Sequence, residues 1–194
     1  MKLKHILILL IFSAVGFQVN GQSLTEEIRT ATEEYIEINQ KLDVDGIMER
    51  VYPKIFEIVP KDMFKEQYKQ LFENKDMTIG FGGFEITEIL DKTITYKKET
   101  FGVAQYAFEM TMKFATNEAD EYILEAFNEK YGKESVAYDK ETSTFSLSMN
   151  SEMFAIKSDG KWYFLENKPE LEAIIGQLIP DEVREAFGEE IKSE

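Results

Sequence analysis

Hydrophobic and polar positions alternate most clearly between residues 104 and 114. Apolar side chains occupy every second position there, and polar or small residues stand between them. The apolar set is Tyr106, Phe108, Met110, Met112 and Phe114. Because successive side chains of a β-strand point to opposite faces, this pattern predicts a long strand with one buried face and one solvated face.

The segment before this strand, residues 23–73, has the periodicity of helices instead. Apolar residues recur every three or four positions over residues 24–42 and again over residues 47–59, as on the buried stripe of a surface helix. Ser23 and Glu26 have the spacing of a capping box, which favours a helix start at Ser23.

Two prolines divide this helical segment. Pro53 predicts a kink or break near Tyr52, because proline removes a helical hydrogen bond and restricts the residue before it. Pro60 suits the first position of a third helix, which is expected to end near Asn74.

Short apolar runs on both sides of the central strand predict further strands. They are expected around residues 84–89, 94–96, 136–138, 145–149, 153–157 and 162–165. Asp159-Gly160 separates the last two runs and is a strong signal for a two-residue hairpin turn. Asp91-Lys92 is interpreted as a second hairpin turn, between the first two runs.

The order of these elements predicts an α+β fold. N-terminal helices would pack on a curled antiparallel sheet of about five or six strands, followed by C-terminal helices after Pro169. A further helix is expected over residues 122–131, inserted between strands. We expect a single domain over residues 22–188 and a charged tail over residues 189–194.

Residues 1–21 have the pattern of an export signal. Lys2 and Lys4 precede an apolar run that starts at Ile6, and small or neutral residues lie before a possible cut at Gln22. The run is shorter than the ~20 residues that span a membrane, which favours a cleaved signal over an anchor. We therefore expect an exported bacterial protein, periplasmic or extracellular, that is not inserted in the membrane after cleavage.

Composition excludes several kinds of chemistry. The chain has no Cys, and its one His, His5, would leave with the signal. Disulfides, thiol nucleophiles, imidazole relays and His- or Cys-ligated metals are therefore not expected. The net charge is −15, and removal of Lys2 and Lys4 with the signal makes it −17. So acidic a chain is not expected to bind nucleic acid.

Two short motifs resemble ligand-binding loops but lack required residues. Asp43-Val44-Asp45-Gly46 would place Lys41 and Tyr52 where a calcium loop needs acidic ligands, so a helix start explains it better. Residues 80–83 form the one glycine-rich stretch, and Glu85 stands where a dinucleotide fingerprint needs its third glycine. A bulge or flexible backbone is the preferred interpretation, and a close backbone approach to a ligand is the alternative. No metal and no cofactor is expected.

The chain resembles the nuclear transport factor two-like superfamily. The resemblance covers about residues 24–166 and consists of N-terminal helices, long antiparallel strands and a closing run from Asp159 to Phe164, Asp-Gly-Lys-Trp-Tyr-Phe. Membership would imply a curled sheet wrapped around a helix into a cone, whose mouth is often a pocket. The family contains isomerases, hydrolases and many non-catalytic members, and none of its catalytic motifs aligns here.

The apolar strand face is the candidate ligand pocket. Its expected lining is Tyr106, Phe108, Met110, Met112, Met153 and Trp162, although core packing would explain the same residues. The first hypothesis is an exported, non-enzymatic domain that binds a small apolar ligand or a protein partner. The oligomeric state is left open.

Two other hypotheses remain. The protein could be a small isomerase- or hydrolase-type enzyme that uses tyrosine and carboxylate side chains, or an interaction protein without a pocket. A cavity with an inward carboxylate beside a tyrosine would favour the enzyme. A cavity with only apolar walls would favour ligand binding. A closed core without a cavity would favour the hypothesis of an interaction protein.

Overall fold

The computed structural model describes residues 20–191, and side-chain burial is described for residues 24–188. The predicted export signal therefore lies almost wholly outside the described residues.

The α-helices are α1 (Asn20–Gln40), α2 (Val44–Arg50), α3 (Lys61–Phe72), α4 (Asp120–Tyr131), α5 (Glu172–Leu178) and α6 (Asp181–Ile191). The strands are β1 (Met77–Ile89), β2 (Ile94–Tyr96), β3 (Glu99–Phe114), β4 (Val136–Asp139), β5 (Thr144–Ser158) and β6 (Lys161–Glu166). Short 3-10 helices are η1 (Pro53–Glu57), η2 (Lys133–Ser135) and η3 (Pro169–Leu171).

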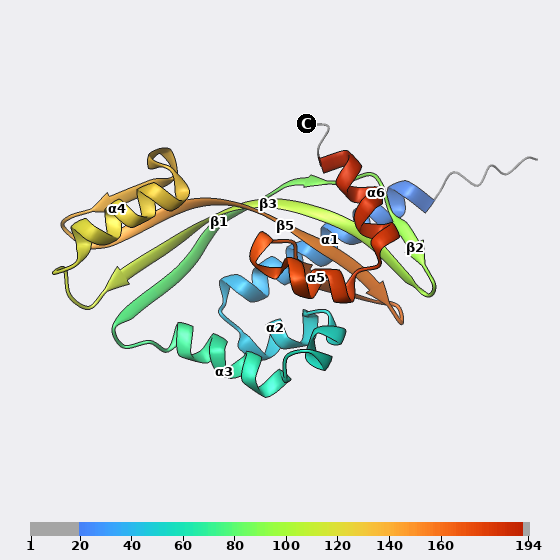
Figure 1. The fold of residues 1–194 in the computed structure, drawn as a ribbon, viewed down its shortest axis with the longest axis horizontal. Helices are drawn as coiled ribbons and strands as arrows, with labels where there is room; N and C mark the ends of the chain where they lie inside the picture. The colour runs from blue at the N-terminus through green and yellow to red at the C-terminus, as the bar shows by residue number, and fades with distance from the viewer. Residues whose placement is uncertain (1–19, 192–194) are drawn as a thin grey trace, which may run out of the picture.

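Within the described residues, the six strands form one curled antiparallel sheet, which confirms the predicted α+β class (Figure 1). The two longest strands, β3 and β5, lie at its centre and pair from Thr100 opposite Lys157 to Lys113 opposite Thr144. On the outer sides, β1 and β2 pair with β3, while β4 and β6 pair with β5. The alternating run of residues 104–114 is thus the central strand that its pattern predicted.

The hairpin turns are only partly where the sequence placed them. Asp159 and Gly160 join β5 to β6 and have φ of 50° and 80°, as a type I′ turn requires. The turn predicted at Asp91-Lys92 is wrong, because β1 and β2 do not pair with each other and both pair with β3. The hairpin turn after β2 is instead Lys97-Lys98, where Tyr96 pairs with Glu99.

The two strands predicted at 145–149 and 153–157 are a single strand, β5. The polar residues between them, Asn150, Ser151 and Glu152, continue the pairing with β3 without a register shift. A strand that is buried on only one face tolerates polar residues in its middle, and the backbone ladder holds them in place.

The N-terminal helices match the prediction except at their ends. The first helix begins at Asn20, three residues before the capping box at Ser23. Helix α2 ends at Arg50, and η1 starts at Pro53, so the break near Tyr52 is confirmed. Pro60 is the residue before α3 rather than its first residue. At the other end of the chain, α6 runs to Ile191, three residues into the predicted tail.

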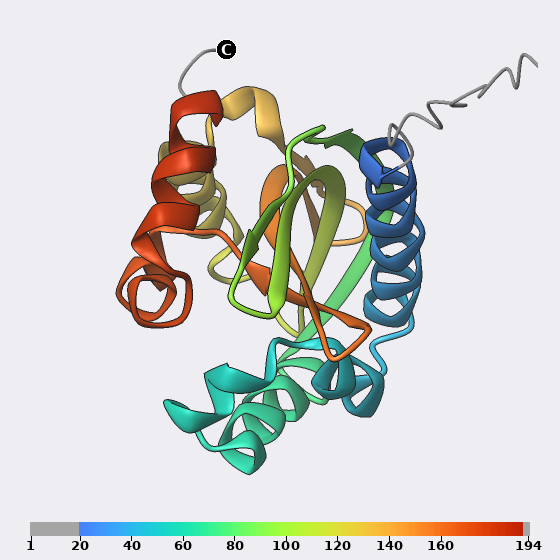
Figure 2. The same ribbon diagram turned by 90° about the vertical axis from the view of Figure 1, so that its right-hand side faces the viewer.

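Helices cover both faces of one half of the sheet (Figure 2). Helix α1 packs on the face that carries Gly102, where a Cβ atom would lie 2.5 Å from Cδ1 of Ile28. On the opposite face, the ring of Phe154 lies 6.2 Å from that of Phe187 in α6. Because this half is covered on both sides, the strands are buried there on both faces, as the adjacent residues Phe154 and Ala155 of β5 show.

Helix α4 covers the other half of the sheet, on the same face as α1. Its Phe127 packs edge-on against Phe145 of β5, at 5.5 Å between ring centroids. Phe145 is fully buried and lies opposite Met112 of β3. The described core is accordingly divided into a large cluster under α1 and α6 and a small one under α4. Between them lies a stretch of the same sheet face that neither helix covers.

The close approach of α1 to Gly102 gives a test of this packing. We predict that Gly102→Ala lowers the free energy of unfolding by about 1–3 kcal/mol, because the new methyl group would overlap Ile28. Ile28→Val removes the overlapping carbon, so the double variant should lose less stability than the two single losses added together. Chemical denaturation measures all three values. Strictly additive losses would show that the two residues do not touch.

Candidate functional site

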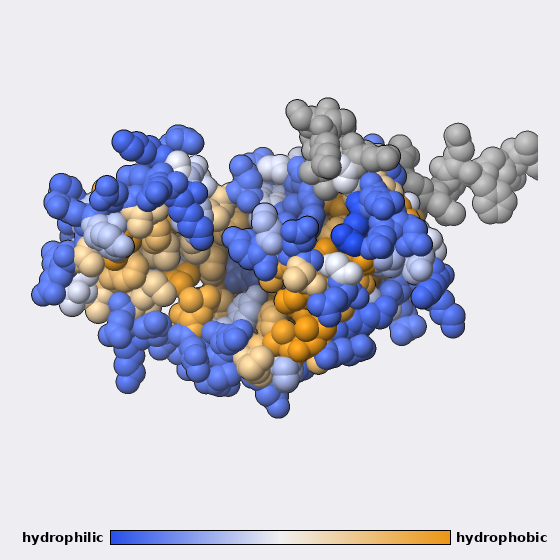
Figure 3. Space-filling model, viewed as in Figure 1, coloured by the Kyte–Doolittle hydropathy of each residue, from blue (hydrophilic) through white to orange (hydrophobic). Residues whose placement is uncertain are grey.

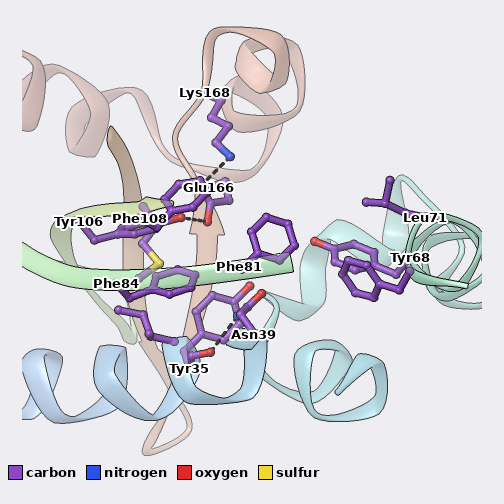
Figure 4. A pocket seen from close by; sticks show the side chains of 13 residues that line it. Tyr35, Asn39, Tyr68, Leu71, Phe81, Phe84, Tyr106, Phe108, Glu166 and Lys168 are labelled. Atoms are coloured by element: carbon purple, nitrogen blue, oxygen red, sulfur yellow. Dashed lines mark hydrogen bonds and ion pairs between the residues drawn. The ribbon is translucent and has the colours of Figure 1, made fainter. Parts of the chain in front are cut away.

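A cavity of about 180 Å³ lies between α1, α3 and the uncovered part of the sheet face (Figure 4). The sheet contributes Phe81, Phe84, Tyr106, Phe108, Met153 and Glu166. The helices contribute Tyr35, Ile36 and Asn39 from α1 and Tyr68, Leu71 and Phe72 from α3, and Lys168 follows β6. Nearly all of these residues are apolar or aromatic, and Glu166 and Lys168 carry the two formal charges.

Aromatic rings form most of the cavity wall. Phe84 and Phe108 stack at 5.3 Å with 14° between their planes, and Tyr106 stacks on Phe108 at 5.7 Å. On the helix side, Tyr68 and Phe72 are one helical turn apart and meet edge-on at 5.6 Å. Aromatic rings from the sheet and from α3 therefore line the cavity on opposite sides.

A β-bulge in β1 places two phenylalanines on the cavity face. The register of β1 against β3 shifts between Gly82 and Glu85, and Gly83 has φ of +60°, which glycine adopts without strain. In a regular strand, Phe81 and Phe84 would point to opposite faces. The extra residue reverses the alternation, so both rings contact Phe108. The bulge predicted for this glycine-rich stretch is confirmed.

Glu166 is the carboxylate inside this aromatic wall. The Tyr106 hydroxyl donates to its Oε1 at 2.6 Å, and the Ser151 hydroxyl donates to its Oε2 at 2.9 Å. Strand pairing brings these groups together, because Tyr106 lies opposite Ser151 and Met153 lies opposite Glu166. The Lys168 ammonium lies 3.3 Å from Oε2, and the two side chains are 43% and 25% exposed. Glu166 is therefore oriented by two neutral donors and one partly exposed cation.

Three tyrosines from three different elements line the cavity with Glu166 and remain neutral. Burial raises the pKa of Tyr68 to about 12, and the negative charge of Glu166 adds to the rise. Burial also raises the pKa of Tyr106 and of Tyr35, and Glu166 again contributes to both. At neutral pH these phenols are hydrogen-bond donors, and none of them is a phenolate base.

An open groove of about 930 Å³ continues from the cavity along the sheet toward α4. It shares Phe81, Tyr106, Phe108 and Lys168 with the cavity and adds Met110 and Met149 as its floor. Figure 3 shows the surface hollowed near the centre of the molecule, with apolar side chains on both sides. A ligand larger than the cavity could therefore extend into the groove.

The structure brings together some of the predicted pocket residues and separates others. Tyr106, Phe108 and Met153 line the cavity, and Met110 lines the groove. Met112 is buried under α4 beside Phe145 instead. Trp162 lies elsewhere, where its indole N–H donates to Glu27 at 3.3 Å.

Several site residues were missed from the sequence. Glu166 is the last residue of β6 and lies one position beyond the strand predicted at residues 162–165, while Tyr35 and Tyr68 occupy apolar positions of amphipathic helices. Helical spacing does show that Tyr68 and Phe72 share a face, but it does not show that this face borders a cavity.

Comparisons with known proteins add no family: no protein-family model matches the chain, and no curated protein matches it. Over residues 20–191, no helix combines the length and the apolar character that crossing a membrane requires. In the same part of the chain, no three His, Cys, Asp or Glu side chains are grouped so that they could hold a metal ion.

The hydrogen bond between Tyr106 and Glu166 can be tested by removing the hydroxyl. Tyr106→Phe should lower the free energy of unfolding by about 1.5–3 kcal/mol, because a partly buried carboxylate loses a donor. Tyr122→Phe is the matched control, since Tyr122 is 76% exposed and should change stability by less than about 0.5 kcal/mol. Equal losses in the two variants, measured by denaturation, would contradict this assignment.

The raised pKa of Tyr68 predicts a dependence of stability on alkaline pH. A phenol with a pKa of about 12 in the folded chain and about 10 in the unfolded chain stabilises the fold below pH 10. That contribution is lost as the pH rises from about 10 to about 12. Tyr68→Phe should therefore lose stability less steeply than the wild-type chain over this range. Denaturation at several pH values gives the unfolding free energy of each protein as a function of pH. Parallel curves for the wild-type chain and Tyr68→Phe would mean that the Tyr68 hydroxyl is not buried.

Proposed function

We propose that this protein binds a small organic molecule with a single ring in the cavity between α1, α3 and the sheet. The observation that carries the proposal is a mostly aromatic cavity of about 180 Å³ with one oriented carboxylate. An apolar protein cavity of about 150 Å³ takes up benzene, so this one has room for a ring with a short substituent. The rings of Phe84 and Phe108 would stack on the ligand, and the neutral phenol of Tyr68 would donate a hydrogen bond to it.

The proposal also includes two expectations that rest on sequence. Binding would take place outside the cytoplasm, given the export signal predicted at residues 1–21. The likeness to the nuclear transport factor two-like superfamily is supported by a cavity enclosed between N-terminal helices and a curled sheet.

A second candidate function is an isomerase or hydrolase in which Glu166 transfers a proton. The 2.6 Å hydrogen bond between Tyr106 and Glu166 inside the cavity favours it. Against it, each oxygen of Glu166 already accepts a hydrogen bond from a protein hydroxyl, and all three phenols stay neutral. A ligand recovered unchanged after incubation supports binding. Conversion of the ligand by the wild-type protein, together with loss of that conversion in the Glu166→Gln variant, supports catalysis.

A bulky substitution at the cavity rim tests the binding site. Leu71 lines the cavity from α3 and is 40% exposed, so Leu71→Trp should fold and should weaken binding of benzyl alcohol at least about tenfold by occupying the space. Met63 is on the same helix and 49% exposed but does not line the cavity, so Met63→Trp should leave binding unchanged. Ligand-observed NMR titration measures both affinities. Equal affinities in the two variants would place the ligand elsewhere or show that none is bound.

A further inference from the structure

We propose that the cavity selects an organic cation, namely an ammonium group carried on a single aromatic or apolar ring, with Glu166 as its counter-ion. This inference rests on the proposed function and names the class of ligand. It is carried by the charges at the cavity, the arrangement of the rings and the position of Lys168.

The charge inside the ring cluster is negative. Among the described residues that line the cavity, only Glu166 and Lys168 carry formal charges. The donors that orient Glu166 from within the fold are the hydroxyls of Tyr106 and Ser151, which are neutral. They position the carboxylate without cancelling its charge. A ligand in the cavity therefore faces an anion whose counter-charge has to come from Lys168 or from the ligand.

Lys168 pairs with the same carboxylate that the ligand's ammonium would face. Its Nζ lies 3.3 Å from Glu166 Oε2 and approaches from outside the ring cluster (Figure 4). The lysine side chain is 43% exposed, and an ion pair this exposed contributes at most about 1 kcal/mol. A ligand ammonium can displace it at little cost, because the Lys168 ammonium then returns to water.

The aromatic walls favour a cation as well. The face of an aromatic ring is the negative end of its quadrupole, so stacked rings beside a carboxylate reinforce its field. The charge of Glu166 acts across the cavity, because it adds to the rise that burial causes in the pKa of Tyr35, Tyr68 and Tyr106. An anionic ligand would meet the same field as repulsion, and a neutral ligand would gain nothing from it.

Three probes of nearly equal shape separate charge from size. Benzylamine is a cation near neutral pH, benzyl alcohol is neutral and benzoate is an anion. We expect calorimetric titration of the full chain to show benzylamine binding at least about tenfold more tightly than benzyl alcohol, with benzoate weakest. Added salt should weaken the binding of benzylamine more than that of benzyl alcohol.

Two variants at the site should change the preference for benzylamine over benzyl alcohol in opposite directions. Glu166→Gln should reduce the ratio of benzylamine to benzyl alcohol affinity to about one, because the counter-ion is gone. Lys168→Gln should raise the affinity for benzylamine by about threefold, because the competing ammonium is removed. Glu109→Gln removes one carboxylate from the exposed face of β3, away from the cavity, and should leave the wild-type ratio unchanged.

The outcomes distinguish a failure of this inference from a failure of the proposed function on which it rests. If none of the three probes binds, both fail. If the probes bind but benzyl alcohol or benzoate binds as tightly as benzylamine, the cavity is a binding site without a preference for cations, and only the inference fails. A preference that survives Glu166→Gln, in protein whose circular dichroism and melting temperature show it folded, overturns the role of Glu166.

Discussion

The pairing of β3 with β5 is the interaction on which the rest of the structure depends. The two strands run side by side in one unbroken register, from Thr100 opposite Lys157 to Lys113 opposite Thr144. This register places Tyr106 beside Ser151 and Met153 beside Ala104, so the groups around Glu166 converge from parts of the chain far apart in sequence. A slip of one residue would turn the side chains of one strand to the face opposite those of the other.

The cavity exists because helices cover the sheet unevenly. Helix α1 packs tightly against the sheet at Gly102, whereas α3 has no fully buried residue and contacts the sheet mainly through aromatic rings, such as Phe72 against Phe81. The same part of the fold therefore lacks the dense packing of the core and gains a surface that can bind a ligand.

The carboxylate in this cavity is tolerated because its hydrogen bonds are made. Desolvating a charged group is costly unless the protein supplies donors, and here Tyr106 and Ser151 both donate to Glu166 while Lys168 remains within reach. The arrangement leaves part of the negative charge uncompensated on the side of the rings. That residual charge distinguishes this cavity from an ordinary packing defect, and it is the physical basis of the proposed preference for a cation.

The sequence by itself determined the elements that depend on local physics. Alternation over residues 104–114 predicts a long strand, and Pro53 predicts the helix break. Asp159-Gly160 predicts the hairpin between β5 and β6, because both residues tolerate positive φ. These patterns also give the α+β class and three of the cavity residues, Tyr106, Phe108 and Met153. The failed turn at Asp91-Lys92 shows the limit, because a polar pair between two apolar runs does not say which strands pair.

Only the tertiary structure decided which side chains meet. Glu166 lies 60 residues from Tyr106 and 15 from Ser151 along the chain, and no local pattern encodes those contacts. The same holds for Trp162 and Met112, whose apolar character predicts burial but not location. Trp162 lies against Glu27, and Met112 lies under α4. Periodicity identifies which face of an element is buried. What that face contacts, and whether the contact is complete, depends on long-range packing of the whole chain.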